Sequence, residues 1–325
     1  MSLIALAALI IVSLTACNRP AEQYFVFGTF LEVSSDSGEA ELAASAAQYM
    51  TELEKTVSAS AEGSDIWNIN RASAGEPVKC SEVTVELLLK ARHLYELTEG
   101  AYDPSVYPLV KLWGFGPGDF VAGAPMTPPS DADIEAALAL VGFGENDFVI
   151  DEVNLTVTKS RNGAMLDLGG ITKGYAVEKA LGLVADGGNA LINLGGNIGA
   201  CGRTYTIGIG APRESEKGYL GTLSLYAGEC ITTSGDYERY FEYGGERYHH
   251  IINPFTGRPA KSGLISVTVI SRDGGFGDAL ATALMVAGAD KGRELLKSMS
   301  ADGVCAVFVY EDMSVEAIGR EFTKA

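Results

Sequence analysis

The chain has 325 residues, and its 42 acidic and 24 basic side chains give a formal net charge of −18. This balance disfavours nucleic acid and anionic lipid surfaces as partners, because both are negatively charged. The length suits one large domain or two, and an anionic ligand would need local help from a metal ion, glycines or helix ends.

The N-terminus reads as an export signal. Residues 2–16, SLIALAALIIVSLTA, are uncharged and have the length of a signal-peptide core, whereas a membrane span needs ~20 residues. The run ends in Leu-Thr-Ala-Cys17, which is typical of a bacterial lipobox. No basic residue precedes it, so a plain secretory peptide or an N-terminal anchor is the alternative. We predict a signal peptide over 1–16, a lipidated Cys17 with a tether to residue 23, and one domain over 24–325.

The first half of the remaining chain alternates strands with helices. A strand over 24–34 is broken by Gly28, and apolar residues at helical spacing predict a helix over 39–57. Further predicted elements are a capped helix at 64–70, a helix at 83–98 with Ser81 as N-cap, an irregular loop over 100–120, a helix at 130–140 and a hairpin over 148–160. The aromatic, Gly- and Pro-rich loop is typical of a ligand-facing segment or a domain boundary.

The second half carries more strands. The predicted strands are 164–168, 190–194, 204–210, 221–226, 230–234, 237–243, 265–271 and 303–310, and the predicted helices are 172–185, 278–287 and 292–299. Because the strands and helices do not alternate strictly, the pattern favours an α+β fold over a doubly wound parallel sheet.

The stretch AMLDLGGITKGYAVEKA, residues 164–180, reads as a strand, a glycine turn at Gly169 and Gly170, and a helix. Two glycines there would permit φ > 0 and close approach of a ligand, and the helix N-terminus behind them suits a phosphate. Asp167 and Lys173 place opposite charges on either side of the bend. The alternative is a tight connection without a ligand. The spacing is not that of a dinucleotide-binding fingerprint.

Asp278 and Thr282 are four residues apart on a predicted helix, so both side chains project from one face. A carboxylate, a hydroxyl and backbone carbonyls make an oxygen-only set, which suits Mg²⁺. The alternative is an N-cap Asp in the first helical turn with an ordinary surface Thr.

Two of the three histidines are adjacent, in YHHIINPFTGRP at 248–259. Neighbouring residues of a strand point to opposite faces, so at most one of these histidines enters a given site. It could be a structural hydrogen-bonding group or a base. His93 is expected on a helix surface. A serine hydrolase, for which Ser234 would be the best nucleophile, is disfavoured because no G-x-S-x-G elbow exists.

Four cysteines remain after Cys17, namely Cys80, Cys201, Cys230 and Cys305. Their wide and irregular spacing contains no zinc pattern. We expect four separate buried thiols, with a disulfide as the alternative in an extracytoplasmic protein.

Several motifs taken together resemble the FAD:protein FMN transferase (ApbE) family. They are FGTF (27–30), GAYDPSVYPLVKLWGFG (100–116), DLGGITKGYA (167–176), INLGGN (192–197), TSGDYERYF (233–241), YHHIINPFTGRP (248–259) and SVTVISRDGGFGDALATALMV (266–286). The resemblance runs in order over residues 24–320. It implies an α+β, T-fold-related architecture with antiparallel or mixed sheets flanked by helices and a flavin cleft between subdomains.

The resemblance also implies a site. It assigns Mg²⁺ to the backbone carbonyl of Gly170 and the side chains of Asp278 and Thr282, with Ala281 beside them. It assigns contacts with the substrate FAD to Phe27, Ala101, Tyr102, Asp103, Asp167, Lys173 and the backbone of Ile252. His250 corresponds to a histidine that could activate the acceptor hydroxyl, so His250 and Asp278 are the expected catalytic residues. In this sequence, Ala59-Ser60-Ala61 lacks an aromatic residue that many members carry, and Asn253 replaces an Asp.

The implied reaction is Mg²⁺-dependent transfer of FMN from FAD to a threonine hydroxyl of an acceptor flavoprotein, with release of AMP. The expected acceptor belongs to a membrane electron-transfer complex, and the lipid anchor would hold the enzyme at the extracytoplasmic face of the bacterial cell membrane. Two alternatives use the same site: an FAD pyrophosphatase that releases FMN and AMP, and a non-catalytic flavin-binding lipoprotein.

Overall fold

The computed structural model describes residues 24–325 except 117, 185–187 and 214–217. The predicted signal peptide, the tether and Cys17 therefore lie outside the described residues. Within the described part, no helix combines the length and the apolar composition that crossing a bilayer requires.

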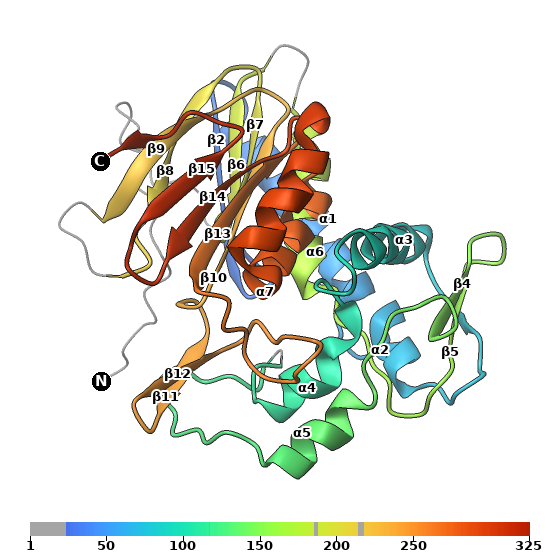
Figure 1. The fold of residues 1–325 in the computed structure, drawn as a ribbon. Helices are drawn as coiled ribbons and strands as arrows, with labels where there is room; N and C mark the ends of the chain where they lie inside the picture. The colour runs from blue at the N-terminus through green and yellow to red at the C-terminus, as the bar shows by residue number, and fades with distance from the viewer. Residues whose placement is uncertain (1–23, 117, 185–187, 214–217) are drawn as a thin grey trace.

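An eight-stranded antiparallel sheet forms the body of the molecule (Figure 1). Its strand order is β1-β2-β6-β7-β10-β13-β14-β15. The bounds are β1 Tyr24–Val26, β2 Thr29–Ser35, β6 Ala190–Leu194, β7 Asn197–Cys201, β10 Cys230–Gly235, β13 Leu264–Ser271, β14 Cys305–Tyr310 and β15 Val315–Ile318. Strand β13, LISVTVIS, is buried along its whole length, and its polar residues Ser266, Thr268 and Ser271 are buried with its apolar ones.

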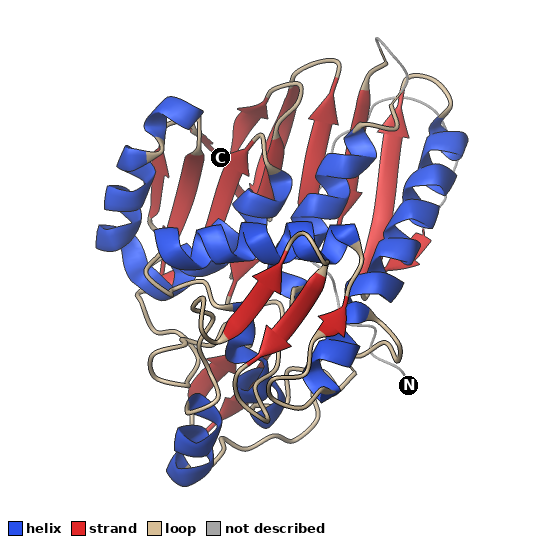
Figure 2. Cartoon of the chain, turned by 90° about the vertical axis from the view of Figure 1, so that its right-hand side faces the viewer, coloured by secondary structure: helices blue, strands red, loops and turns tan. Residues whose placement is uncertain are grey.

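Both faces of this sheet are covered, as Figures 1 and 2 show. Helices α1 (Glu39–Val57), α6 (Gly169–Leu181) and α7 (Gly274–Ser298) pack on one face. On the other face lies a three-stranded sheet of β8 (Tyr205–Gly210), β9 (Tyr219–Leu225) and β16 (Thr323–Lys324). A second apolar cluster, which includes Ile207, Leu223 and Ile231, fills the space between the two sheets.

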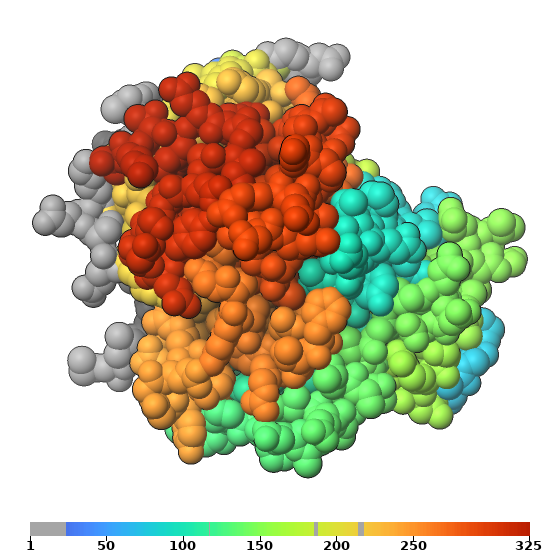
Figure 3. All heavy atoms as spheres, in the orientation of Figure 1, coloured from blue at the N-terminus to red at the C-terminus, as the bar shows by residue number. Residues whose placement is uncertain are grey.

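The remaining residues form a second layer below the sheet, which we call the lower lobe, residues 58–163 and 236–262. It contains α2 (Asp65–Arg71), α3 (Glu82–Leu97), η1 (Pro104–Val106), α4 (Tyr107–Leu112), α5 (Asp131–Leu138), the small sheet β3 (Val78–Lys79), β5 (Thr156–Lys159) and β4 (Phe148–Asp151), and the hairpin β11 (Tyr240–Tyr243) and β12 (Glu246–His249). The Trp113 indole N–H donates to the carbonyl of Gly257 at 2.8 Å and joins its two segments. Figure 3 shows the segment around residue 250 packed between α7 and residues 110–140.

The predicted α+β class is confirmed, and every recorded strand pair is antiparallel. Helices α1, α2, α3 and α5 lie where the periodicity places them. Ser64, Ser81 and Ser130 cap α2, α3 and α5, because each hydroxyl accepts a backbone N–H of the first turn. The described cysteines are free, although Cys201 is only half-buried.

The interpretation of the glycine pair is wrong. Residues 164–168 form no strand, and Gly169 and Gly170 are the first residues of α6, with negative φ. The similar pair Gly195 and Gly196 does form a turn, with φ of 56° and 92°. The predicted start of the helix that carries Asp278 is also wrong: α7 begins at Gly274 with Asp273 as N-cap, so Asp278 lies beyond its first turn. The two predicted helices, 278–287 and 292–299, are confirmed as separate helical segments of α7, because Gly288 between them has non-helical φ and ψ of 80° and 174°.

Other differences concern strands. Residues 237–239 are not in a strand, and β11 pairs with β12 outside the main sheet. The predicted strand at 24–34 is a hairpin, because Phe27 and Gly28 both have positive φ and turn the chain. Strands β3, β7, β12, β15 and β16 were not predicted.

Candidate functional site

The site is built around the crossing of α6 and α7, where Gly174 meets Gly274. A Cβ on Gly174 would lie 2.0 Å from the carbonyl oxygen of Gly274, and one on Gly274 would lie 2.3 Å from that of Gly174. Neither glycine has positive φ, so close helix approach, and not backbone conformation, excludes a side chain at both positions. This contact brings the N-terminal turns of α6 against the residues of α7 that follow Gly274.

Asp278 projects from α7 into this crossing. Its side chain accepts a hydrogen bond from the N–H of Gly174 at 3.0 Å, and the residue is 5 % exposed. In the described part of the chain it forms no ion pair. Burial raises the pKa of Asp278, while Lys173 and the Gly174 N–H oppose the rise. A buried carboxylate with so little compensation fits a site for a cation.

Two more oxygens lie beside it. A Cβ on Gly170 would be 3.7 Å from the Thr282 hydroxyl oxygen, so the first turn of α6 faces Thr282. In a regular helix the N–H of Gly174 donates to the carbonyl of Gly170, and here Asp278 competes for that proton. Asp278, Thr282 and the Gly170 carbonyl therefore fit the hard, oxygen-only ligand set that Mg²⁺ prefers. Ala281 is fully buried beside them and offers no side-chain oxygen.

No group of three or more His, Cys, Asp or Glu side chains suited to a metal occurs among the described residues. A metal at the crossing would thus depend on hydroxyl and backbone oxygens, as the resemblance implies. The N-cap alternative for Asp278 is excluded, because Asp273 fills that role by accepting the N–H of Phe276.

The segment 101–103 approaches the crossing from the lower lobe. The Tyr102 ring lies against Gly170, at 3.5 Å from a Cβ built there, and its buried hydroxyl has no hydrogen-bond partner among the described residues. Burial raises the pKa of Tyr102 well above its ordinary value, and Asp278 and Asp167 raise it further. Asp103 instead turns toward Ser105, whose N–H and hydroxyl both donate to its Oδ1. Burial raises the pKa of Asp103 to about 6.

Asp167 and Lys173 flank the start of α6. The N–H of Gly169 donates to Asp167 Oδ1 at 2.9 Å, and the N–H of Asp167 donates to the carbonyl of Pro104. Leu166, the residue before Asp167, is held by Asn70: the Asn70 amide donates to the Leu166 carbonyl and accepts the Leu166 N–H. Lys173 is next to Gly174, to whose N–H Asp278 is bonded, and its positive charge opposes the rise in the pKa of Asp278 and helps to lower the pKa of His250.

The adjacent histidines have different surroundings, as their position at the end of β12 predicts. His249 is buried, its Nε2 bonds to the carbonyl of Ala260 at 2.8 Å, and its Nδ1 accepts the N–H of Ile251. His250 has a buried Nδ1 that makes no hydrogen bond within the part of the chain that the structure describes. Burial, together with Arg239, lowers the pKa of His250 well below its ordinary value, so its imidazole is neutral and has a nitrogen available. His249 is therefore structural, whereas the His250 ring lies edge-on to Phe115, with ring centroids 6.4 Å apart. His93 is exposed.

The turn after His250 explains one departure from the family pattern. Asn253 Oδ1 accepts the N–H groups of Phe255 and Thr256, a role that an Asp would fill equally well. Ile252 pairs with Pro259 as a bridge whose hydrogen bonds come from the flanking residues, so its own N–H and carbonyl point away from that strand. Phe27 lies in the β1–β2 turn, at the end of the sheet where β10 also ends.

Three residues of the motif TSGDYERYF were missed as individual site residues. Ser234 contacts Thr282, with their hydroxyl oxygens 3.2 Å apart. Glu238 and Arg239 are exposed, yet desolvation raises the pKa of Glu238 and lowers that of Arg239. Only the tertiary structure reveals these contacts, because 237–239 reads as part of a strand.

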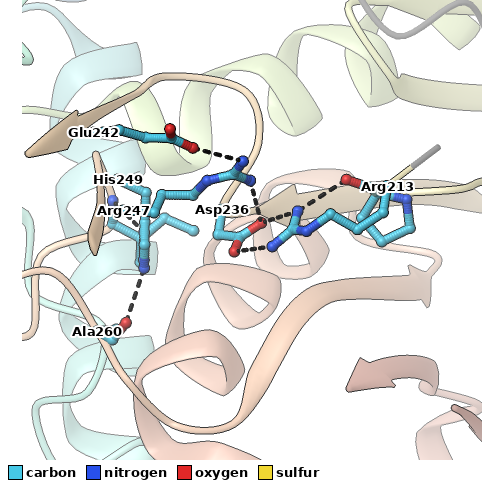
Figure 4. Close-up of polar contacts among 8 residues, drawn as sticks. Arg213, Asp236, Glu242, Arg247, His249 and Ala260 are labelled. Carbon is cyan, nitrogen blue, oxygen red and sulfur yellow. Dashed lines mark hydrogen bonds and ion pairs between the residues drawn. The ribbon is translucent and has the colours of Figure 1, made fainter. Parts of the chain in front are cut away.

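An ion-pair network anchors this motif (Figure 4). Arg213 donates two hydrogen bonds to the two carboxylate oxygens of Asp236, at 2.8 and 2.6 Å, and Arg247 approaches Asp236 from the other side at 3.9 Å. Arg247 also contacts Glu242, so the end of β10 is tied to the β11–β12 hairpin. The segments that carry Glu238 and His250 are thereby held in fixed positions.

Known proteins resemble this chain in sequence and in fold. A family profile described as the ApbE family matches residues 27–308. The chain belongs to the ApbE family. An FAD:protein FMN transferase of Klebsiella pneumoniae is 35 % identical over 277 residues, which cover 84 % of each chain.

Solved ApbE structures share the fold. The ApbE protein of Thermotoga maritima has a TM-score of 0.81 at 33 % identity, with 92 % of this chain and 96 % of that one covered. The flavinyl transferase ApbE of Pseudomonas stutzeri, in its apo form, has a TM-score of 0.75 at 30 % identity, with 94 % of each chain covered. The fold and family expected from the motifs are therefore confirmed.

The structure unites most of the residues expected from the ApbE resemblance. Gly170, Asp278, Thr282, Tyr102, Asp167, Lys173 and His250 share one region through the contacts and electrostatic interactions described above. Asp103 is adjacent but is bonded to Ser105. Two surface hollows, of about 390 and 290 Å³, contain none of the predicted site residues, so the flavin cleft stays a prediction.

Proposed function

We propose that this protein transfers FMN from FAD to a threonine hydroxyl of an acceptor flavoprotein and releases AMP. The observation that carries the proposal is the buried Asp278 carboxylate beside Thr282 and Gly170, in a chain related over most of its length to FAD:protein FMN transferases. Membership of the family supports the transfer, and the chemistry of the oxygen set supports dependence on Mg²⁺.

The reaction balances without a redox step. The acceptor hydroxyl oxygen forms a bond to the phosphorus of the FMN half, the bond from that phosphorus to the bridging oxygen breaks, and AMP leaves with that oxygen. The hydroxyl proton passes to a base, for which the unpartnered Nδ1 of the neutral His250 is suited. Mg²⁺, when bound, offsets the negative charge of the diphosphate and of the leaving oxygen.

The residues of the chain have separate tasks in this proposal. Asp278, Thr282 and the Gly170 carbonyl hold the cation. Lys173 lies near Asp278 and supplies fixed positive charge in a protein that is otherwise acidic. The Tyr102 hydroxyl, buried without a partner, has a hydrogen bond to offer the flavin nucleotide.

The test is mass spectrometry of an acceptor domain with an exposed threonine, incubated with the full chain, FAD and Mg²⁺. We expect a covalent FMN on the threonine, absent with EDTA. Asp278→Asn should abolish the adduct, whereas Asp290→Asn, a fully exposed position on the same helix, should leave it intact. Release of AMP and free FMN without an adduct would identify a pyrophosphatase instead. FAD retained unchanged would identify a flavin-binding protein.

We also propose a location. The lipobox at Cys17 supports a lipid anchor at the extracytoplasmic face of the bacterial membrane, where an acceptor of a membrane electron-transfer complex would present its threonine. An anchor that leaves the enzyme at the surface of the acceptor's membrane raises the local concentration of both.

A further inference from the structure

Ser234 is the one side chain of another element that is recorded in a hydrogen bond with the Thr282 hydroxyl among the described residues. The two oxygens are 3.2 Å apart, and either can be the donor. The alternative acceptor for the Thr282 proton is the carbonyl of Asp278, one turn earlier in α7, at 3.5 Å. That distance is at the limit of a hydrogen bond, so Ser234 is the better partner.

The strand that carries Ser234 explains why it faces α7. Residues of β10 alternate between the two faces of the sheet. Ile231 belongs to the cluster between the sheets, and Thr233 pairs with Thr268 on that same side, with hydroxyl oxygens 2.9 Å apart. Thr232 and Ser234 therefore point toward the helices. The alternation along β10 therefore places Ser234 beside Thr282 and directs Thr233 to the opposite face of the sheet.

A threonine hydroxyl binds a cation through an oxygen lone pair, and the cation makes its proton a stronger donor. The proton must then go to a fixed acceptor, or the hydroxyl rotates among several orientations and the lone pair is not held for the cation. Groups outside the ligand set that accept or donate such protons fix the orientation of ligands, and their removal costs about 10–100-fold in metal affinity.

We infer that Ser234 is a positioning residue for the cation site: it accepts the proton of Thr282 and so fixes the hydroxyl that, in the proposed function, binds Mg²⁺. Asp278 supplies the charge of the site, and Ser234 supplies the orientation of its neutral ligand. Ser234, the serine of TSGDY, fills this role through the hydrogen bond of its hydroxyl and does not act as a nucleophile.

The experiment titrates Mg²⁺ into the full chain without FAD and follows the thermal unfolding midpoint, which rises as a ligand binds the native state. Relative to the unaltered chain, Ser234→Ala should raise the Mg²⁺ concentration for half-maximal stabilisation about tenfold. Ser234→Thr, which keeps the hydroxyl, should restore it to within about threefold. Thr233→Val, on the opposite face of the same strand, should leave it unchanged. At saturating Mg²⁺, FMN transfer by Ser234→Ala should recover.

Wild-type affinity for Mg²⁺ in Ser234→Ala would overturn the inference while leaving the proposed function intact. Loss of FMN transfer that saturating Mg²⁺ does not restore would also overturn it, because Ser234 would then act on the substrate. Absence of Mg²⁺ binding by the unaltered chain would instead defeat the metal assignment itself, with Asp278→Ala as the reference for a chain that has lost the site.

Discussion

Asp103 and Asp278 are two buried carboxyl groups that the fold treats differently. Asp103 accepts two hydrogen bonds from Ser105 and has a pKa of about 6, because desolvation outweighs those bonds. Asp278 has one donor and faces the oxygens of Thr282 and Gly170. Asp103 is therefore a structural cap with a pKa of about 6, and Asp278 is suited to binding a cation.

The Asp103 pKa predicts how stability depends on pH. The folded state binds the proton near pH 6 and the unfolded state near 3.8, so this group contributes stability that is complete below pH 3.8 and lost as pH rises through 6. The full span corresponds to about 3 kcal/mol. Asp103→Asn should keep the cap and flatten this part of the pH profile, measured by urea unfolding between pH 4 and 7. An unchanged slope would contradict the prediction.

His250 gives a prediction for activity. Because its pKa lies well below 6.5, the imidazole stays neutral as the pH falls from 8 to 6.5, and the transfer rate should not lose a base over that range. His250→Ala should bind FAD normally and slow the transfer at least 100-fold, in line with general-base catalysis. Fluorescence titration measures the binding, and the adduct measures the rate. His93→Ala, at an exposed position, is the control, and equal rates for both variants would remove His250 as the base.

At the scale of elements, the crossing of α6 and α7 should tolerate no side chain. Gly174→Ala would put a Cβ 2.0 Å from the Gly274 carbonyl and 2.8 Å from Cβ of Asp278, so the helices must separate. We expect a loss of about 1–3 kcal/mol in the free energy of unfolding, as for an overpacked core, and weaker Mg²⁺ binding. Urea denaturation measures the first. Gly210→Ala, where a Cβ meets nothing within 4 Å, should be nearly neutral.

The elements also show what a sequence can predict. Periodicity and serine caps located α1, α2, α3 and α5, because those signals are local. The glycine pair at the start of α6 was interpreted as a turn, although Gly169 and Gly170 have negative φ. A glycine that a neighbouring backbone requires also looks the same in sequence as one that positive φ requires. Gly174 is explained by Gly274, one hundred residues away.

For the site, too, local signals can be predicted from the sequence and tertiary contacts cannot. Helical spacing predicts that Asp278 and Thr282 share a face of one helix, and the family motif predicts a role for His250. Ser234, Glu238 and Arg239 were missed, because their positions depend on the register of β10 and on the network at Asp236, which are not local properties. The family resemblance supplied Tyr102, and the structure supplied the reason, a buried hydroxyl without a partner.

At the scale of the whole molecule, the N-terminal signal makes a separate prediction. If Cys17 carries the lipid, Cys17→Ser should move the protein from the membrane fraction of the cell to the soluble extracytoplasmic fraction. The variant would lack the acyl chains that firm anchoring requires. Cys201→Ser changes a free thiol within the fold and should leave the protein at the membrane. Immunoblots of the fractions measure both, and a membrane-bound Cys17→Ser variant would show that the apolar segment itself is the anchor.

Gly174 and Gly274 touch backbone to backbone, so α6 and α7 cannot slide past each other, and Gly170 and Asp278 move as one body with Thr282. Tyr102 and His250 come from loops of the lower lobe. In the proposed function, substitutions in those loops would therefore change which flavin nucleotide or acceptor is admitted, while the helix pair that would hold the cation stays unchanged. Such a chain can diverge in specificity by exchanging loops, with the helix pair as the part that must be conserved.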